Sequence, residues 1–232
     1  VNDCVIIGSG AGAGALLAGA SGSTFIGTAA GASITSGIGN VAIGYQSLDA
    51  AATSDYNTAV GHSALGAVNG DGTGGNTAIG WSNSVALTSG TGNTSVGYQC
   101  LSGHLTGTDN IAIGYNTMND TGAGSTSAGS TSNIAIGKQA MGASWSNNNA
   151  SNYNIAIGVQ SMYGAMDGAL NNVAVGHQAL TALTTGDQNV CIGAGAGEAI
   201  TTGYDNICIG YRAGDAFDSD VENIFIGTNS GG

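Results

Sequence analysis

The chain has 232 residues, of which 43 are Gly and none is Pro, and its formal net charge is −12. Lys138 and Arg212 are the only Lys or Arg residues, so no basic patch is available for nucleic acid or for an anionic membrane surface. No apolar run approaches the about 20 residues that span a bilayer, so membrane insertion is not expected. Collagen is excluded because Gly does not recur at every third position, and regularly spaced apolar residues argue against disorder.

A five-residue phrase, plainest at 133–137 as Asn-Ile-Ala-Ile-Gly, returns along the whole chain. Its closing glycines are Gly8, Gly27, Gly44, Gly61, Gly80, Gly97, Gly114, Gly137, Gly158, Gly176, Gly193, Gly210 and Gly227. Seven of the twelve intervals are 17 residues long, and the others range from 18 to 23. A period of this size is typical of a solenoid. We therefore expect residues 1–232 to form a single array, an all-β parallel β-solenoid of about thirteen repeats with a 17-residue base period.

The first copy, residues 4–17, resembles the Gly-rich turn of a dinucleotide-binding fold. However, the first acidic residue that follows it is Asp49, which is too far along the chain to hold a ribose. Residues 190–197 repeat the same pattern as another copy of the phrase. We therefore expect no cofactor here.

Two positions of the phrase predict its strands. The residue three before the closing glycine is β-branched in every copy, and the residue one before it is always Ile or Val. Short β-branched runs bounded by Asn and Gly favour strands, in which residues two apart face the same way. We expect each coil to contain two short strands joined by turns, with coils stacked about 4.8 Å apart.

The residue between those two positions varies in size along the chain. It is Ala in most middle copies, and in the end copies it is Ile6, Phe25, Cys191, Cys208 or Phe225. Four residues after the glycine, Leu or Met generally accompanies Ala, whereas Gly accompanies the larger residues. This exchange of volume predicts that the two positions meet inside the coil. Ser84 departs from the rule, and Val85 or Leu87 is expected to fill its space.

Cys191 and Cys208, one period apart, should stack as small buried side chains or as a disulfide bridge.

If that pair fills the coil interior, the β-branched positions must be buried elsewhere. A narrow coil has only one inside, so a second apolar face predicts a core shared with other subunits. The expected shared-core residues are Ile43, Val60, Ile79, Val96, Ile113, Ile136, Ile157, Val175, Ile192 and Ile209.

Asn opens the phrase in eleven of the thirteen copies. Stacked Asn side chains form amide ladders, and Asn tolerates left-handed backbone. Extra residues enter at about 119–132 and 142–153, where we expect loops on one side of the array. Trp145 and Tyr153 flank an Asn-rich stretch in the second loop and are predicted to be exposed, either as a glycan-contact surface or within a tolerated insertion.

Large side chains follow the closing glycine in many copies and predict an outward stripe. Its candidate contact residues are Tyr45, Trp81, Tyr98 and Tyr115, together with His62, Lys138, His177 and Tyr211 in the same column. Such rings either stack against sugars or shield the strands below them.

No set of residues predicts catalysis or a metal site. The three histidines and four cysteines lack zinc-ligand spacing. Asp215, Asp218, Asp220 and Glu222 cluster without a calcium-loop pattern, so a solvated turn is expected. The chain is therefore not expected to be an enzyme. An enzyme built on a β-solenoid would need a groove with paired acids, which the repeats do not offer.

The longer phrases Asn40-Val-Ala-Ile-Gly-Tyr-Gln-Ser-Leu48 and Asn172-Val-Ala-Val-Gly-His-Gln-Ala-Leu180 resemble two groups of repeats. They are similar to the head repeats of YadA-type trimeric autotransporter adhesins and to repeats of bacteriophage tail fibres. The resemblance covers nearly the whole chain and implies a left-handed parallel β-roll, assembled as a homotrimer and used for attachment.

The period is longer here than in the YadA-type head, which favours the fibre. The expected function is therefore a structural segment of an extracellular virion tail fibre that attaches to a glycan or protein receptor on the host surface. The alternative is the head of an adhesin, or another filament, on a bacterial cell surface.

Overall fold

The computed structural model describes residues 3–14, 20–69, 74–119, 129–145 and 149–232. Its named elements are three-residue strands. They are β1 (Val5–Ile7), β2 (Thr24–Ile26), β3 (Val41–Ile43), β4 (Thr58–Val60), β5 (Thr77–Ile79), β6 (Thr94–Val96), β7 (Ile111–Ile113), β8 (Ile134–Ile136), β9 (Ile155–Ile157), β10 (Val173–Val175), β11 (Val190–Ile192), β12 (Ile207–Ile209) and β13 (Ile224–Ile226). In these ranges, no helix has the length and apolar character needed to cross a membrane.

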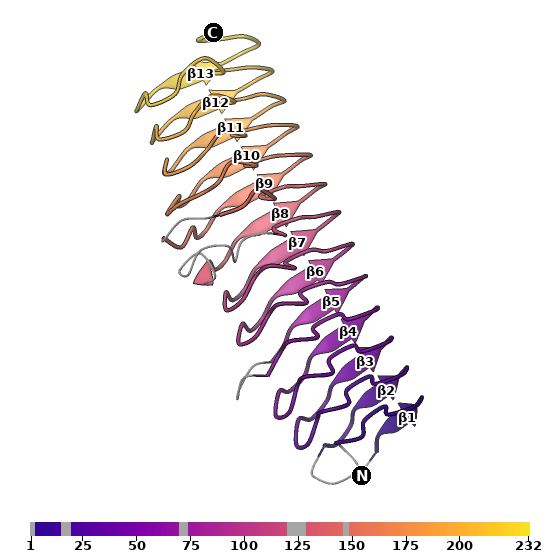
Figure 1. The fold of residues 1–232 in the computed structure, drawn as a ribbon. Helices are drawn as coiled ribbons and strands as arrows, with labels where there is room; N and C mark the ends of the chain where they lie inside the picture. The colour runs from indigo at the N-terminus through magenta and orange to yellow at the C-terminus, as the bar shows by residue number, and fades with distance from the viewer. Residues whose placement is uncertain (1–2, 15–19, 70–73, 120–128, 146–148) are drawn as a thin grey trace. The chain divides into compact units, whose positions relative to one another are not determined.

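The chain divides into two compact units, Val1–Asp109 with β1–β6 and Asn110–Gly232 with β7–β13. Within each unit the strands are parallel and lie side by side in sequence order (Figure 1). Equivalent positions of the phrase pair in register, as Ala42 does with Ala59, 17 residues further on. The predicted all-β parallel solenoid with a 17-residue period is confirmed.

The prediction of two strands per coil is wrong, because the chain makes turns after the closing glycine. Gln46 and Leu48, two and four residues after Gly44, have φ angles of 52°, in the left-handed region that interrupts an extended strand. The Gln46 N–H donates to the Thr28 carbonyl at 3.0 Å, and the Leu48 N–H donates to the Ala64 carbonyl at 2.9 Å. The turn after the glycine therefore forms backbone hydrogen bonds to the coils before and after it. These bonds hold non-glycine residues in a left-handed conformation that costs about 1–3 kcal/mol per residue.

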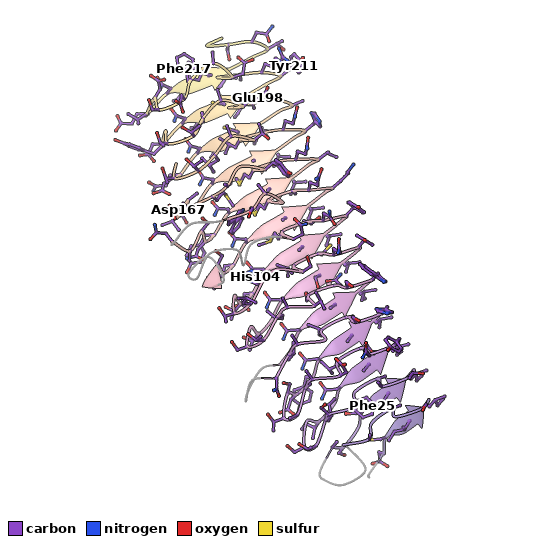
Figure 2. All side chains as sticks on the ribbon, in the orientation of Figure 1. Phe25, His104, Asp167, Glu198, Tyr211 and Phe217 are labelled. Carbon is purple, nitrogen blue, oxygen red and sulfur yellow. The ribbon has the colours of Figure 1, made fainter. Side chains whose placement is uncertain are left out.

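The predicted exchange of volume inside the coil is confirmed. Phe25 of β2 is fully buried (labelled in Figure 2), and a Cβ added at Gly31 would lie 2.5 Å from its ring. In the second unit, a Cβ at Gly214 would lie 2.6 Å from the Cys208 Sγ. Where the strand residue is only Ala42, the partner position is Leu48, and both are fully buried. Gly is thus required wherever the facing side chain is large.

The one departure from that rule is resolved by a hydrogen bond and a neighbouring leucine. The Ser84 hydroxyl lies 2.8 Å from the Ser95 hydroxyl, the strand residue of the next coil. Leu87 is fully buried, whereas Val85 is only half-buried, so Leu87 is the residue that fills the interior.

Cys191 and Cys208 are register partners on β11 and β12, and both are buried free thiols. A hydrogen bond with Cys208, together with burial, raises the pKa of the Cys191 thiol, which keeps it protonated. These cysteines therefore pack as small interior side chains, as one of the two predicted alternatives had it.

The predicted Asn ladder is confirmed. The Asn172 Nδ2 donates to the Asn154 Oδ1 at 3.0 Å, and the same oxygen accepts the Asn172 N–H at 3.0 Å. The Asn172 Nδ2 also donates to the Gly186 carbonyl at 2.8 Å. The left-handed residue of this turn is the one before each Asn, such as Tyr153 with a φ of 60°. The ladder Asn residues themselves do not use the left-handed conformation that Asn tolerates.

Candidate functional site

The first candidate surface is the outer strand face, formed by the side chains three and one residues before each closing glycine. Ile113 and Ile192 on this face are 37% and 40% exposed. The middle residue of each strand points the other way, and in the strand of Ile113 this residue, Ala112, is fully buried. All ten predicted shared-core residues lie on the outer strand face, either half-buried or exposed. They do not fill the interior of their own coils.

The composition of the outer strand face differs between the two units. In the first unit, the position three before the glycine is Thr24, Thr58, Thr77 or Thr94 in four of its six strands. In the second unit, that position is Ile or Val in all seven strands. The second unit therefore presents an uninterrupted apolar face in the isolated chain.

The second candidate surface is the ring column, formed by the residues directly after each closing glycine. Tyr45, Trp81, Tyr98 and Tyr115 of this column are exposed, as predicted. In the first unit, consecutive rings stack on one another. The ring centroids lie 5.0 Å apart for Tyr45 and His62, 6.1 Å for His62 and Trp81, and 4.9 Å for Trp81 and Tyr98. Because each ring face is turned towards its neighbour, this stack offers mainly ring edges to solvent, where a sugar cannot lie flat.

The prediction that Trp145 is an exposed contact residue is wrong, because its side chain is fully buried. It belongs to an interior column that the sequence reasoning missed. Seven residues after the closing glycine, buried side chains recur: Ile34, Ala51, Val68, Leu87, His104, Leu183 and Ile200. Trp145 and Met166 stand eight residues after their glycines, in longer coils, and are also fully buried. One inserted residue therefore shifts this column and hides it from a fixed-period reading.

Tyr153, the other predicted loop contact, is 59% exposed. Part of each predicted loop, 120–128 and 146–148, lies outside the described residues. In the described part of the second loop, Asn149 donates both its backbone N–H and its Nδ2 to the Asp167 Oδ1 at 3.0 Å. Asp167 lies on the opposite side of the coils from Tyr211 of the ring column (Figure 2). The loop and the ring column are thus separate surfaces of the second unit.

The acidic residues 215–222 form an exposed turn. The Thr201 hydroxyl donates to the Asp218 carboxylate, and the Asp218 carbonyl accepts N–H groups from the same preceding turn, including that of Gly203. Among the residues that the structure describes, no group of three His, Cys, Asp or Glu side chains is placed to hold a metal ion.

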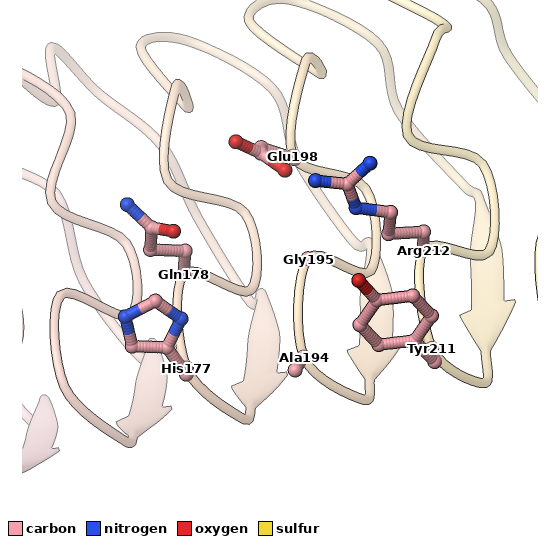
Figure 3. A pocket seen from close by; sticks show the side chains of 7 residues that line it. All are labelled: His177, Gln178, Ala194, Gly195, Glu198, Tyr211 and Arg212. Carbon is pink, nitrogen blue, oxygen red and sulfur yellow. The ribbon is translucent and has the colours of Figure 1, made fainter.

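The ring column of the second unit has a gap. His177, Ala194 and Tyr211 follow one another in consecutive coils, and the small Ala194 leaves a pocket of about 210 Å³ between the two rings (Figure 3). Gln178, Gly195, Glu198 and Arg212 complete the lining. In the sequence this gap is visible only as a small residue in the column. The polar side chains beside it come from three different coils, so the sequence does not show that they lie together.

Comparisons with protein-family models, with curated proteins and with solved structures find no match to this chain.

Proposed function

We propose that the chain is a structural segment of an extracellular attachment fibre, assembled as a homotrimer through its outer strand face. The observation that carries the proposal is the exposure of this face in the isolated chain, with Ile79, Ile157 and Ile192 each about two-fifths exposed. Contiguous apolar surface of this kind marks an interface with another chain.

The coil interior leaves no alternative place for these side chains. Ala78, Ala156 and Cys191, which separate the outer residues on their strands, are fully buried against side chains of the same coil. The outer residues point the other way because side chains alternate along a strand. A closed symmetric oligomer buries the same face of every copy without leaving any copy unpaired. The number of three subunits and the left-handed coil are taken from the resemblance to YadA-type heads and tail fibres.

An attachment role in a phage tail fibre is supported by the same resemblance and by the surface chemistry. The chain has only 7% charged residues, so hydroxyl and amide groups form most of its polar surface. These groups are suited to hydrogen bonds with a glycan or protein receptor on a host cell. The head of a bacterial surface adhesin would need the same apolar assembly face and the same polar surface. The sequences of the flanking genes distinguish the two proposals.

The assembly is tested by mass photometry of the purified protein. Three chains of 22.3 kDa should give a single species of about 67 kDa. Ile136→Asp should give monomers or unfolded chains, because an unpaired carboxylate buried between subunits costs several kcal/mol. Val159→Asp adds the same charge to an exposed position of the ring column and should remain trimeric. A folded monomer of the unaltered chain would refute the proposal.

The attachment role is tested separately on an array of glycans and bacterial surface polysaccharides. The trimer should bind a subset of them, and Tyr153→Ala, at an exposed loop position, asks whether that loop takes part. Unchanged binding by Tyr153→Ala would remove the loop residue from the contact surface. A trimer that binds neither the array nor any bacterial cell would count against attachment.

A further inference from the structure

We propose that the gap in the ring column at Ala194 is a binding slot for one neutral pyranose ring. This deepens the proposed attachment function, on which its biological use rests. The slot itself is formed by residues of a single chain, His177 to Arg212, so it does not depend on assembly. The inference rests on the spacing of two rings, on an interrupted amide ladder and on the charges at the rim.

The slot has the thickness of one missing ring. Coils of a parallel sheet repeat at about 4.8 Å, so His177 and Tyr211, two coils apart, are separated by about 9.6 Å along the sheet. A ring placed midway would lie about 4.8 Å from each. Consecutive rings of the first unit have nearly this spacing, with 4.9 Å between the centroids of Trp81 and Tyr98. The slot therefore has room for one ring-sized group between the His177 and Tyr211 side chains (Figure 3), in the space that a ring fills in the complete stack.

An amide ladder ends at Gln178, which lines the slot on the same coil as His177. The Gln160 Nε2 donates to the Gln139 Oε1, and the Gln178 Nε2 donates to the Gln160 Oε1, each at 3.5 Å. The next position is Gly195, which has no side chain to donate to the Gln178 Oε1. A ligand hydroxyl in the slot takes the place of that missing donor.

The rim supplies both a donor and an acceptor. Arg212 lies over the Tyr211 ring, with 5.7 Å between the guanidinium carbon and the ring centroid. Its guanidinium and the Glu198 carboxylate both line the pocket. A Cβ added at Gly195 would come within 3.2 Å of the Arg212 Cγ and of a Glu198 carboxylate oxygen. Glycine at this position keeps the two polar groups open to the slot.

These features favour a neutral sugar over other flat ligands. The two faces of a pyranose carry C–H groups that pack against aromatic rings, and its edge carries hydroxyls that both donate and accept hydrogen bonds. The Glu198 carboxylate offsets the positive charge of Arg212 at the rim, and the net charge of −12 disfavours a phosphate or an acidic sugar. The pocket volume of about 210 Å³ is below the about 300–1,000 Å³ of sites for drug-sized ligands. One sugar unit is the size that fits.

The test is saturation-transfer NMR on the purified full chain with methyl glycosides of glucose, galactose and mannose. At least one of them should receive saturation on its ring protons. Ala194→Tyr fills the slot with a residue that other coils carry in the same column, so folding is preserved. This variant should weaken binding by about tenfold or more, because its ring occupies the space of the ligand. Thr28→Tyr adds the same ring to the same column in the first unit and should bind as the unaltered protein does.

Glu198→Gln and an aromatic probe define the ligand class. Glu198→Gln should weaken the glycoside that binds, because the amide is a poorer acceptor than the carboxylate. Binding of phenol but of no glycoside would overturn the proposal in favour of an aromatic ligand. Glycoside binding that survives Ala194→Tyr would overturn the location. Mass photometry of the same samples reports assembly independently, so loss of the slot and loss of the trimer are distinguished.

Discussion

The two units have the same coil interior but differ in the residues on the coil surface. In both, Ala faces Leu or Met inside the coil, or a large side chain faces Gly, and an Asn ladder runs along the turn. On the outside, the first unit has Thr at four outer strand positions and a stack of four rings. The second unit has only Ile or Val at those strand positions and an interrupted ring column.

This difference separates the residues that make the coil from the residues that give it partners. Positions common to both units fix the fold, because they close the interior and satisfy buried polar groups. Positions that differ lie at the surface, where substitution leaves the coil intact. We infer that association is driven mainly by the second unit, and that the ring column serves as self-shielding in the first unit and as a binding surface in the second.

The largest expected effect concerns the interior, where the units should behave alike. Phe25→Ala should destabilise the protein by about 3–5 kcal/mol, because it leaves a cavity beside Gly31. Phe25→Ala combined with Gly31→Leu recreates the pairing of Ala42 with Leu48 and should recover most of that loss. Urea denaturation measures both. The variant with Gly31→Leu alone should also be destabilised, because its side chain would overlap the Phe25 ring. A stable Gly31→Leu variant would contradict the inferred exchange of volume between these two positions.

The Asn ladder should show a smaller effect and a difference between units. Asn154→Ala leaves the Ala169 carbonyl and the Asn172 N–H without their partners, at about 2–3 kcal/mol in total. The first unit has Ser23 in this column, and its hydroxyl accepts the Asn40 N–H at 3.0 Å and donates to the Ser21 carbonyl at 3.4 Å, without an amide ladder bond. Ser23→Ala should therefore cost about 1 kcal/mol. Equal losses of urea stability in the two variants would argue against the ladder as the stabilising element.

Exchanging one outer strand residue between the units tests which unit drives assembly. Ile134→Thr makes the second unit resemble the first, and Thr77→Ile does the reverse. If both positions are buried between subunits, each exchange changes the association free energy by about 1–2 kcal/mol per chain, in opposite directions. Dilution series followed by mass photometry give the dissociation midpoints. If neither midpoint moves, the outer strand face is not the interface.

The ring column should give the smallest effect. Trp81→Ala removes two stacking contacts in the first unit, from His62 and Tyr98, at about 1–2 kcal/mol in total. Val159→Ala, in the same column of the second unit, removes no ring contact and should change thermal stability by less than about 0.5 kcal/mol. A Trp81→Ala variant as stable as Val159→Ala would show that the stack contributes nothing.

The sequence predicts the strands and the interior pair because both have strict chemical rules. Every strand shows β-branched residues two apart, and every large strand residue has Gly as its partner. The turns on the other side could not be predicted, because residues such as Leu48 and Met118 adopt left-handed backbone there without any compositional signal. Their conformation is imposed by hydrogen bonds to neighbouring coils, which are tertiary interactions.

The candidate surfaces were predictable to different degrees. The outer strand face follows from alternation along the strand, so the ten residues predicted for a shared core lie outside the interior of their own coils. The burial of Trp145 is not apparent from the sequence, because one extra residue in its coil places this interior position eight rather than seven residues after the closing glycine. The slot beside Ala194 required the structure, since only stacking of coils brings Gln178, Glu198 and Arg212 around one absent ring.

The Asn ladder also gives each unit a direction. In the Asn-to-Asn bonds of each unit, the side-chain amide of the later coil donates to the Oδ1 of the earlier coil, from Asn57 to Asn40 in the first unit and from Asn189 to Asn172 in the second. The amide dipoles are therefore aligned head to tail, and each bond polarises the next. Each acceptor also takes the backbone N–H of the later coil, as the Asn172 Oδ1 does from Asn189 at 2.9 Å. A coil stacked in the opposite sense would lose both bonds, so the ladder fixes the direction in which coils stack within each unit.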